Sequence, residues 1–313
     1  MRDEANGRRG AAAGYGADVL GFSETAFVLL RDLIAEQTGL YFADDKRDLL
    51  ADKLSDLMAR LGTTSYLDYY YLLRYDGSAE RYWGELVDRL SVPETYFWRQ
   101  PEQIVALANI VAPRHFERSP ATPLRIWSAA CCTGEEPISI AIALAESGLL
   151  HHRPIQITGS DLSGEMLNRA RRGVYGERSF RSIPGELRQR YFEKADGGWR
   201  VDPSLHAKIT WTSANLVNPV DVRPLAAADV IFCRNVLIYF SDESIVRIAR
   251  SFAADLADDG YLFLGASESL TRLDTDFELT EVGDAFVYVK AAGFRSSRAS
   301  TASERAYTHP GNA

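Results

Sequence analysis

The spacing of apolar residues changes near residue 92 of this 313-residue chain. Before that point apolar positions recur every three or four residues, the period of amphipathic helices. The pattern predicts helices over about 23–38, 45–61, 65–73 and 78–90. Ser23 is a plausible N-cap, and Gly39 and Gly62 are stop signals. Residues 21–91 are therefore expected to form an all-α domain.

After residue 92, strand-length apolar runs alternate with helical patterns. Strands are predicted over about 124–128, 155–160, 229–233 and 260–264, and helices over about 102–116, 137–147, 165–172 and 242–256. This alternation predicts a mostly parallel, doubly wound α/β sheet in residues 92–291. The final segment FELTEVGDAFVYVK predicts an antiparallel hairpin turning at Gly283-Asp284.

Two other parts of the chain break this rhythm. Segments 197–203 and 207–213 are interpreted as short antiparallel strands of a small β lobe inserted at about 176–213. The ends, residues 1–20 and 292–313, are rich in Gly, Ala, Ser and Arg, and disordered tails are predicted there.

Composition narrows the class of protein. The chain is 46% hydrophobic and 25% charged, as in globular proteins, and its net charge of −8 argues against nucleic acid as a partner. It contains neither a bilayer-length apolar run nor a signal peptide, so a cytoplasmic protein without membrane insertion is expected. The three cysteines do not suggest a disulfide framework, and the five histidines have no metal-ligand spacing, so no metal is predicted.

The first candidate binding segment is residues 124–147, LRIWSAACCTGEEPISIAIALAES, where a predicted strand, a tight turn and a helix follow one another. Such a turn binds nucleotide-like ligands in α/β sheets. Only Gly134 remains of the usual glycine-rich pattern, and Cys131 and Cys132 are interpreted as small fillers. Thr133 and Glu136 also fit a capping box. The next strand ends at Asp161, which could cap the following helix or accept hydrogen bonds from ribose hydroxyls.

Four segments resemble the CheR family of chemoreceptor glutamate methyltransferases. They are VPETYFWR (92–99), WSAACCTGEEPISIA (127–141), CRNVLIYF (233–240) and GYLFLGASESL (260–270). The resemblance extends over about residues 18–291. It implies an S-adenosylmethionine (SAM) methyltransferase fold, SAM as donor and S-adenosylhomocysteine as product. It also implies methyl transfer to glutamate side chains in the cytoplasmic domain of a receptor.

The resemblance also implies roles for individual residues. The implied cofactor-binding set is Thr95, Arg99, Glu135, Glu136, Asp161, Asn215, Leu216, Arg234 and Asn235. One of the two glutamates would bind the α-amino group of SAM; the sequence does not separate them, although we favour Glu136. Asn215 and Leu216 would flank the adenine. Arg99 and Tyr239 are expected to have catalytic positioning roles, since a guanidinium is well shaped to hold a carboxylate.

Two features of the chain bear on the partner. Residues 44–60, which include most of the helix predicted at 45–61, contain four basic and five acidic residues. This helix therefore lacks the basic stripe with which typical members of the family contact an acidic receptor. The turn ADGGW (195–199) is also short. The expected partner is therefore a chemoreceptor-type protein recognised without a C-terminal pentapeptide tether. A different methylated protein, a non-catalytic SAM-binding module and a dinucleotide oxidoreductase are the alternatives. The terminal hairpin and the missing G-x-G-x-x-G disfavour the oxidoreductase.

Overall fold

The computed structural model describes residues 22–291, so the predicted tails lie outside the described residues. The described chain divides into two compact units. The smaller unit contains residues 22–34 and 41–90, and the larger contains residues 35–40 and 91–291. The short segment 35–40, at the end of the first helix, therefore packs with the larger unit.

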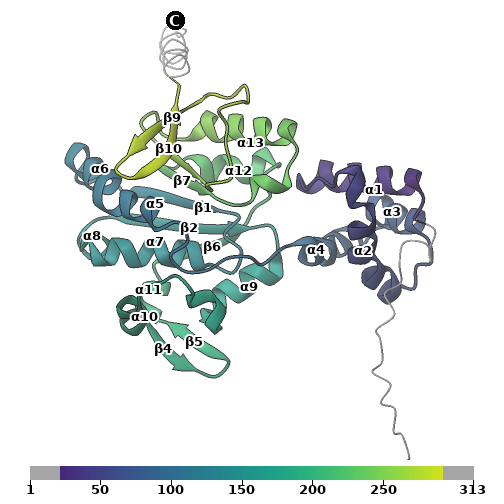
Figure 1. Cartoon of the computed structure of the whole chain (residues 1–313), viewed down its shortest axis with the longest axis horizontal. Helices are drawn as coiled ribbons and strands as arrows, with labels where there is room; N and C mark the ends of the chain where they lie inside the picture. The colour runs from purple at the N-terminus through teal and green to yellow at the C-terminus, as the bar shows by residue number, and fades with distance from the viewer. Residues whose placement is uncertain (1–21, 292–313) are drawn as a thin grey trace, which may run out of the picture. The chain divides into compact units, whose positions relative to one another are not determined.

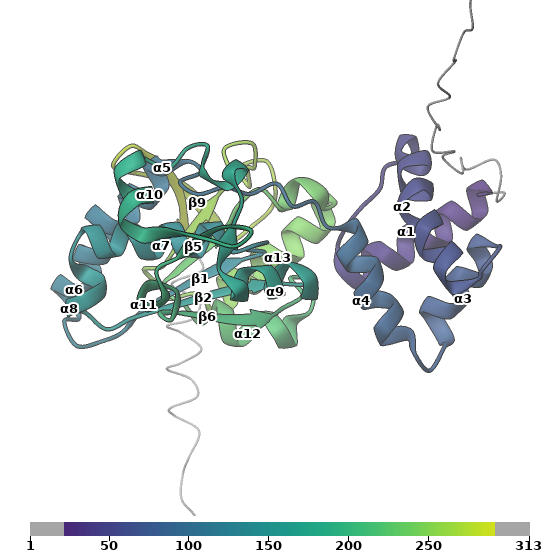
Figure 2. The ribbon, with the colours of Figure 1, turned by 90° about the horizontal axis from the view of Figure 1, so that it is seen from below.

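The smaller unit is helical, as predicted (Figure 2). Its helices are α1 Glu24–Thr38, α2 Arg47–Leu61, α3 Tyr66–Tyr75 and α4 Ala79–Leu90, with a 3-10 turn at Asp44–Lys46. The Ser23 hydroxyl accepts a hydrogen bond from the Ala26 amide at 3.2 Å, which confirms the predicted cap. Gly62 ends α2 in the left-handed conformation, with φ of 67°. Leu50 and Leu54, one turn apart on α2, are fully buried.

The larger unit is built on a seven-stranded sheet (Figure 1). Its strands are β1 Leu124–Ala129, β2 Ile155–Asp161, β6 Ile209–Ser213, β7 Val230–Cys233, β8 Tyr261–Leu264, β9 Phe277–Val282 and β10 Ala285–Lys290. They lie in the order β6-β2-β1-β7-β8-β10-β9. Strand β10 runs antiparallel to both its neighbours, and the other pairs are parallel. The predicted doubly wound sheet ending in a hairpin is confirmed.

Helices cover both faces of this sheet (Figure 1). One face carries α5 Pro101–Ala106, the π-helical turn Leu107–Val111, α6 Ala112–Arg118 and α7 Glu135–Glu146, and the other carries α12 Pro219–Ala226 and α13 Asp242–Asp255. The central strands are apolar on both sides because both sides are covered. Phe232 and Phe263 stack on the first face with ring centroids 4.4 Å apart. The remaining helices are α8 Leu149–His152, α9 Gly164–Arg172, α10 Gly185–Tyr191, α11 Pro203–His206 and the 3-10 turns Glu177–Phe180 and Leu237–Tyr239.

The inserted lobe differs from its prediction. It is a three-stranded antiparallel sheet of β3 Val174–Tyr175, β5 Gly198–Val201 and β4 Phe192–Ala195, in that order. The prediction that segment 207–213 belongs to the lobe is wrong, because β6 pairs in parallel with β2 from Ile209 to Ser213. Strand β6 is the edge of the main sheet. Its short alternating sequence, ITWTS, lacks the continuous apolar run of a central parallel strand.

The strand order places one crevice at the carboxyl ends of the strands. After β1 the chain builds β2 and β6 on one side, whereas β7, β8 and the hairpin lie on the other. The order reverses between β1 and β7, and ligands of open α/β sheets bind outside the carboxyl ends at such a point. The segments after β1, β6 and β7, together with the last residue of β2, contain most of the predicted site residues.

Candidate active site

Backbone strain is concentrated at the predicted site. Five non-glycine residues among those described have positive φ: Trp98, Gln100, Ala130, Cys132 and Asn235. Four of them lie within the motif segments 92–99, 127–141 and 233–240, and Gln100 directly follows the first of these segments. Left-handed conformations of non-glycine residues are costly and are typical of functional sites. The observed backbone therefore favours these segments as a site independently of their sequence.

The turn after β1 is held by the neighbouring strand. The Cys131 amide donates to the Ser160 carbonyl, and the Cys132 amide donates to the Asp161 carboxylate, both at 2.8 Å. Gly134 has φ of 93°, and a Cβ there would lie 2.7 Å from the Trp211 ring. Burial raises the pKa of the Cys132 thiol to about 12, so it stays protonated at neutral pH. This agrees with its interpretation as a filler.

The capping box that Thr133 and Glu136 fit in sequence, the alternative to a cofactor role, is not formed. Gly134 is the N-cap of α7 and contributes no side-chain cap. The Thr133 hydroxyl instead donates to the carboxylate of Glu135 at 2.6 Å, and the Ser179 hydroxyl donates to its other oxygen at 2.9 Å. Glu135 is 2% exposed, and its burial raises its pKa. Its hydrogen-bond partners are neutral, so this buried carboxylate has no cation in contact among the described residues.

Glu136 has a different environment. One of its oxygens accepts from the Ser128 hydroxyl at 2.7 Å, and the other pairs with the Arg234 guanidinium at 2.6 Å. Arg234 is 2% exposed in its side chain and also donates to Gln103 and to the carbonyl of Arg99. The Arg234 guanidinium is thus committed to protein partners. It braces the start of α7, the end of β7 and the segment 99–103.

Arg99 contrasts with Arg234. Its guanidinium is partly exposed and donates one hydrogen bond, to the carbonyl of Glu94 at 2.7 Å. It also lies 5.4 Å from the centroid of the Tyr96 ring. A guanidinium has five N–H donors, so most of the donors of Arg99 have no protein partner in residues 22–291. The preceding backbone is fixed because the Phe97 amide donates to Ser179 and the Trp98 amide to Ser139.

The ends of β2 and β6 present the predicted nucleoside-binding residues. The two oxygens of Asp161 accept from the amides of Cys132 and Ser163 at 2.8 and 2.9 Å. Asn215 donates from its side chain to the Gln37 carbonyl at 2.6 Å, which ties segment 35–40 to the end of β6. Leu216 is buried beside it.

Strand β7 leads into the last predicted site segment. Asn235 has φ of 61°, and a 3-10 turn, Leu237–Tyr239, follows it. Tyr239 is 36% exposed. Glu268, which sequence reasoning did not single out, accepts hydrogen bonds from the backbone of this segment. The only signal for it was its place in the motif GASES.

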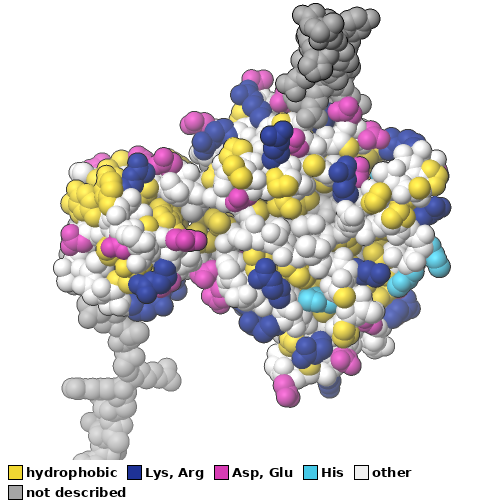
Figure 3. All heavy atoms as spheres, turned by 180° about the vertical axis from the view of Figure 1, so that it is seen from behind, with side chains coloured by type: hydrophobic (Ala, Val, Ile, Leu, Met, Phe, Trp, Pro, Cys, Tyr) yellow, Lys and Arg dark blue, Asp and Glu magenta, His cyan; other side chains and the backbone are white. Residues whose placement is uncertain are grey.

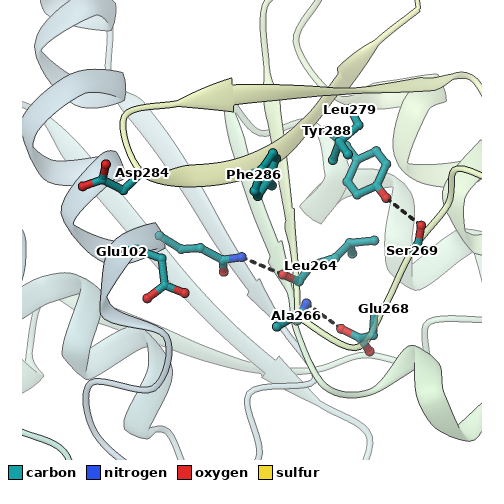
Figure 4. A pocket seen from close by; sticks show the side chains of 11 residues that line it. Glu102, Leu264, Ala266, Glu268, Ser269, Leu279, Asp284, Phe286 and Tyr288 are labelled. Atoms are coloured by element: carbon teal, nitrogen blue, oxygen red, sulfur yellow. Dashed lines mark hydrogen bonds between the residues drawn. The ribbon is translucent and has the colours of Figure 1, made fainter.

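A pocket of about 320 Å³ opens beside the end of β8, the strand next to β7 (Figure 4). Its walls come from the start of α5, the end of β8 and the hairpin; they include Glu102, Gln103, Leu264, Glu268, Leu279 and Phe286. Leu279 and Phe286 are 48% and 60% exposed. Gln103 joins the pocket to the brace described above, since its side chain also contacts Arg234. The pocket therefore lies next to the candidate site, one strand further along the sheet.

The charge of the crevice indicates the kind of ligand. Glu135 and Glu136 occupy the first turn of α7, where a dinucleotide would place its pyrophosphate. Two carboxylates there repel a phosphate, and Asp161 adds a third acidic side chain nearby. SAM suits this set, because it has ribose hydroxyls, an ammonium group and a sulfonium. The fold and the site thus define the class of SAM-dependent methyltransferases.

Comparison with known proteins identifies the family. The family model described as "CheR methyltransferase, SAM binding domain" matches residues 93–286, and "CheR methyltransferase, all-alpha domain" matches residues 25–91. The chain belongs to the CheR methyltransferase family and is a methyltransferase that uses SAM.

Relatives cover nearly the whole described chain. Chemotaxis protein methyltransferase 2 of Vibrio cholerae is 34% identical over 270 residues, which are 86% of this chain and 93% of the relative. Chemotaxis protein methyltransferase Cher2 of Pseudomonas putida is 32% identical and covers 84% of this chain and 96% of its own length. A solved structure, magnesium protoporphyrin IX methyltransferase of Synechocystis with bound SAM, matches 76% of this chain and 97% of its own. Its identity is 15%, with a TM-score of 0.33.

Proposed function

We propose that this protein methylates glutamate side-chain carboxylates of a chemoreceptor-type protein in the cytoplasm. The observation that carries the proposal is the contrast between its two site arginines. Arg234 is buried and committed, whereas Arg99 is partly exposed with most of its donors free. A free guanidinium at a methyltransferase site suits a carboxylate substrate. The names of the relatives, which are chemotaxis protein methyltransferases, support the same substrate class.

The cofactor contacts follow from the charges in the crevice. Asp161 ends β2 and would accept hydrogen bonds from ribose hydroxyls, and Asn215 and Leu216 lie at the neighbouring strand end for the adenine. Of the two glutamates, the geometry favours Glu135 as the partner of the SAM ammonium group. The charge of Glu136 is already paired with that of Arg234, whereas Glu135 contacts hydroxyls. A buried carboxylate is stabilised by a cationic partner, and the ligand would supply one.

The chemistry asked of the side chains is limited. Bound SAM supplies an electrophilic methyl group. A glutamate carboxylate is already ionised at neutral pH, with a pKa of about 4.3, so no general base is required. Arg99 would hold one carboxylate oxygen and leave the other free to react, and Tyr239 would line the opposite side. Correct alignment of this kind can contribute several kcal/mol to the rate.

The distribution of surface charge bears on how a receptor fragment would be recognised. On the face in Figure 3, basic and acidic side chains are interspersed rather than gathered by sign. Several basic residues of the helical unit are paired with acidic ones, including Arg31 with Asp44 and Arg89 with Asp56. Within residues 22–291, none of the helices is long and apolar enough to cross a bilayer. The interspersed charges and the paired arginines support recognition of a receptor fragment without a strong electrostatic component.

The direct test is methyl transfer from labelled SAM to purified receptor cytoplasmic fragments. The expected result is incorporated label that mild base releases, because carboxyl methyl esters hydrolyse readily. A fragment with its glutamates replaced by alanine is the matched control. Binding of SAM without labelling of any fragment, or label that resists base, would contradict the proposal.

A further inference from the structure

The carboxylate of Glu268 is surrounded by backbone donors. One oxygen accepts from the amides of Val236 and Leu237 at 2.8 and 2.7 Å. The other accepts from the amides of Asn235 and Gly265 at 2.7 and 2.6 Å. Figure 4 shows Glu268 at the end of β8, with a dashed line to the adjoining backbone. One side chain therefore satisfies four amide groups that the sheet leaves without strand partners.

Three of these amides are consecutive, and they form a concave anion site. Asn235 is left-handed, with φ of 61°, which turns the amides of residues 235–237 toward one point. The space is tight as well: a Cβ on Gly265 would lie 2.5 Å from the Asn235 side chain and 2.7 Å from Glu268. The strained turn thus depends on a carboxylate in this position.

We infer that Glu268 is a positioning residue for the methyl transfer assigned to this site under the proposed function. It fixes the turn 235–237, and the 3-10 turn carrying Tyr239 continues from it without a break. The Tyr239 amide donates to the Val236 carbonyl at 3.1 Å, so the position of Val236 is transmitted to Tyr239. Glu268 acts through this backbone and need not touch substrate or cofactor.

An amide side chain cannot replace this carboxylate. Each oxygen of Glu268 accepts from two N–H groups, and in Glu268→Gln one of those oxygens becomes an NH₂ donor. In either orientation two backbone donors would then face a third donor. The matched control is Glu102→Gln, since Glu102 lines the same pocket, is exposed and has no hydrogen bond among the described residues (Figure 4).

Amide hydrogen exchange tests the inference without any methyl transfer. In the wild-type protein the amides of Asn235, Val236 and Leu237 should be protected, although they lie outside helices and strands. In Glu268→Gln their exchange should be faster by about tenfold or more, whereas Glu102→Gln should leave it unchanged. Wild-type exchange at the rate of an unprotected peptide would overturn the inference, whether or not the variant folds.

Turnover supplies the second readout. At saturating SAM, Glu268→Gln should lower kcat about tenfold or more and change the affinity for S-adenosylhomocysteine much less. In Glu268→Ala, added formate should restore part of the turnover by occupying the anion site. Faster exchange with no methylation by the wild-type protein would uphold the fixing of the turn 235–237 by Glu268 and refute the receptor substrate. Full turnover in Glu268→Gln would overturn the positioning role and leave the proposed function intact.

Discussion

The neighbouring glutamates at the start of α7 should respond to the same substitution in opposite ways. Glu135 is buried, contacts two hydroxyls, and has its pKa raised by burial. In the unfolded chain the same group ionises at its ordinary pKa, about 4.3. The free energy of unfolding therefore falls as the pH rises above that value and levels off above the pKa of the folded state. At neutral pH the ligand-free protein is therefore less stable than it would be if the pKa of Glu135 were the same in the folded and unfolded states.

Glu135→Gln removes that cost and keeps the packing. A hydroxyl can donate or accept, so Thr133 and Ser179 can both bond a glutamine. The variant should be more stable than wild type at pH 7 to 8, and the difference should vanish below about pH 4. A gain of 1 kcal/mol raises the Tm of a domain of 150–250 residues by about 2–4 °C. The affinity for S-adenosylhomocysteine should fall, because a charge-assisted hydrogen bond contributes about 1.5–3 kcal/mol, or roughly 10- to 150-fold.

Glu136→Gln is the matched control, because it breaks an ion pair, whereas Glu135→Gln removes a carboxylate that has no cation in contact among the described residues. Arg234 is 2% exposed and Glu136 12% exposed in their side chains, and loss of one partner of a buried pair costs about 3 kcal/mol or more. Thermal unfolding across pH and titration calorimetry measure both variants. If Glu135→Gln is less stable than wild type at pH 7, or binds S-adenosylhomocysteine as tightly, the assigned role of Glu135 is wrong.

Three further outcomes are expected. Asp161→Ala should weaken S-adenosylhomocysteine binding about 10- to 150-fold by calorimetry, because ribose hydroxyls lose a charged acceptor; unchanged affinity would exclude the ribose contact. Arg99→Ala and Tyr239→Phe should each lower the turnover of methyl transfer about tenfold or more and change the cofactor affinity much less. Wild-type turnover in either variant would show that the residue has no positioning role. Removal of a receptor fragment's last residues should leave its methylation unchanged, and lost activity would refute tether-independent recognition. The rate of methylation should depend only weakly on salt, since exposed charges are screened within about 10 Å at 0.1 M salt and α2 has no basic stripe to be screened. A steep fall of the rate with salt would refute recognition without a strong electrostatic component.

The elements that the sequence predicted well are those whose pattern is local. The period of Leu50, Leu54 and their neighbours identifies α2, and Gly283-Asp284 between two apolar runs identifies the hairpin. Strand β6 was misassigned because an edge strand has one partner, and its sequence does not say which sheet provides it. Similarly, nothing in segment 35–40 shows that it packs with the larger unit.

Within the candidate site, residue types were predictable but their partners were not. Glu135 and Glu136 have the same local sequence signal, and only the fold separates the carboxylate that pairs with Arg234 from the one that contacts hydroxyls. Arg234 directly follows strand β7, almost one hundred residues further along the chain. Glu268 illustrates the same limit, because its four partners are backbone amides that have no side-chain signature.

Mapping the methylated residue by mass spectrometry tests the central claim most directly. The measurement compares a receptor fragment treated with SAM and wild-type protein against the same fragment treated with the Arg99→Ala variant. The account predicts methyl esters on glutamate side chains, lost after mild base and nearly absent with the variant. A base-stable methyl group on another residue type, or no modified residue while SAM is bound, would contradict it.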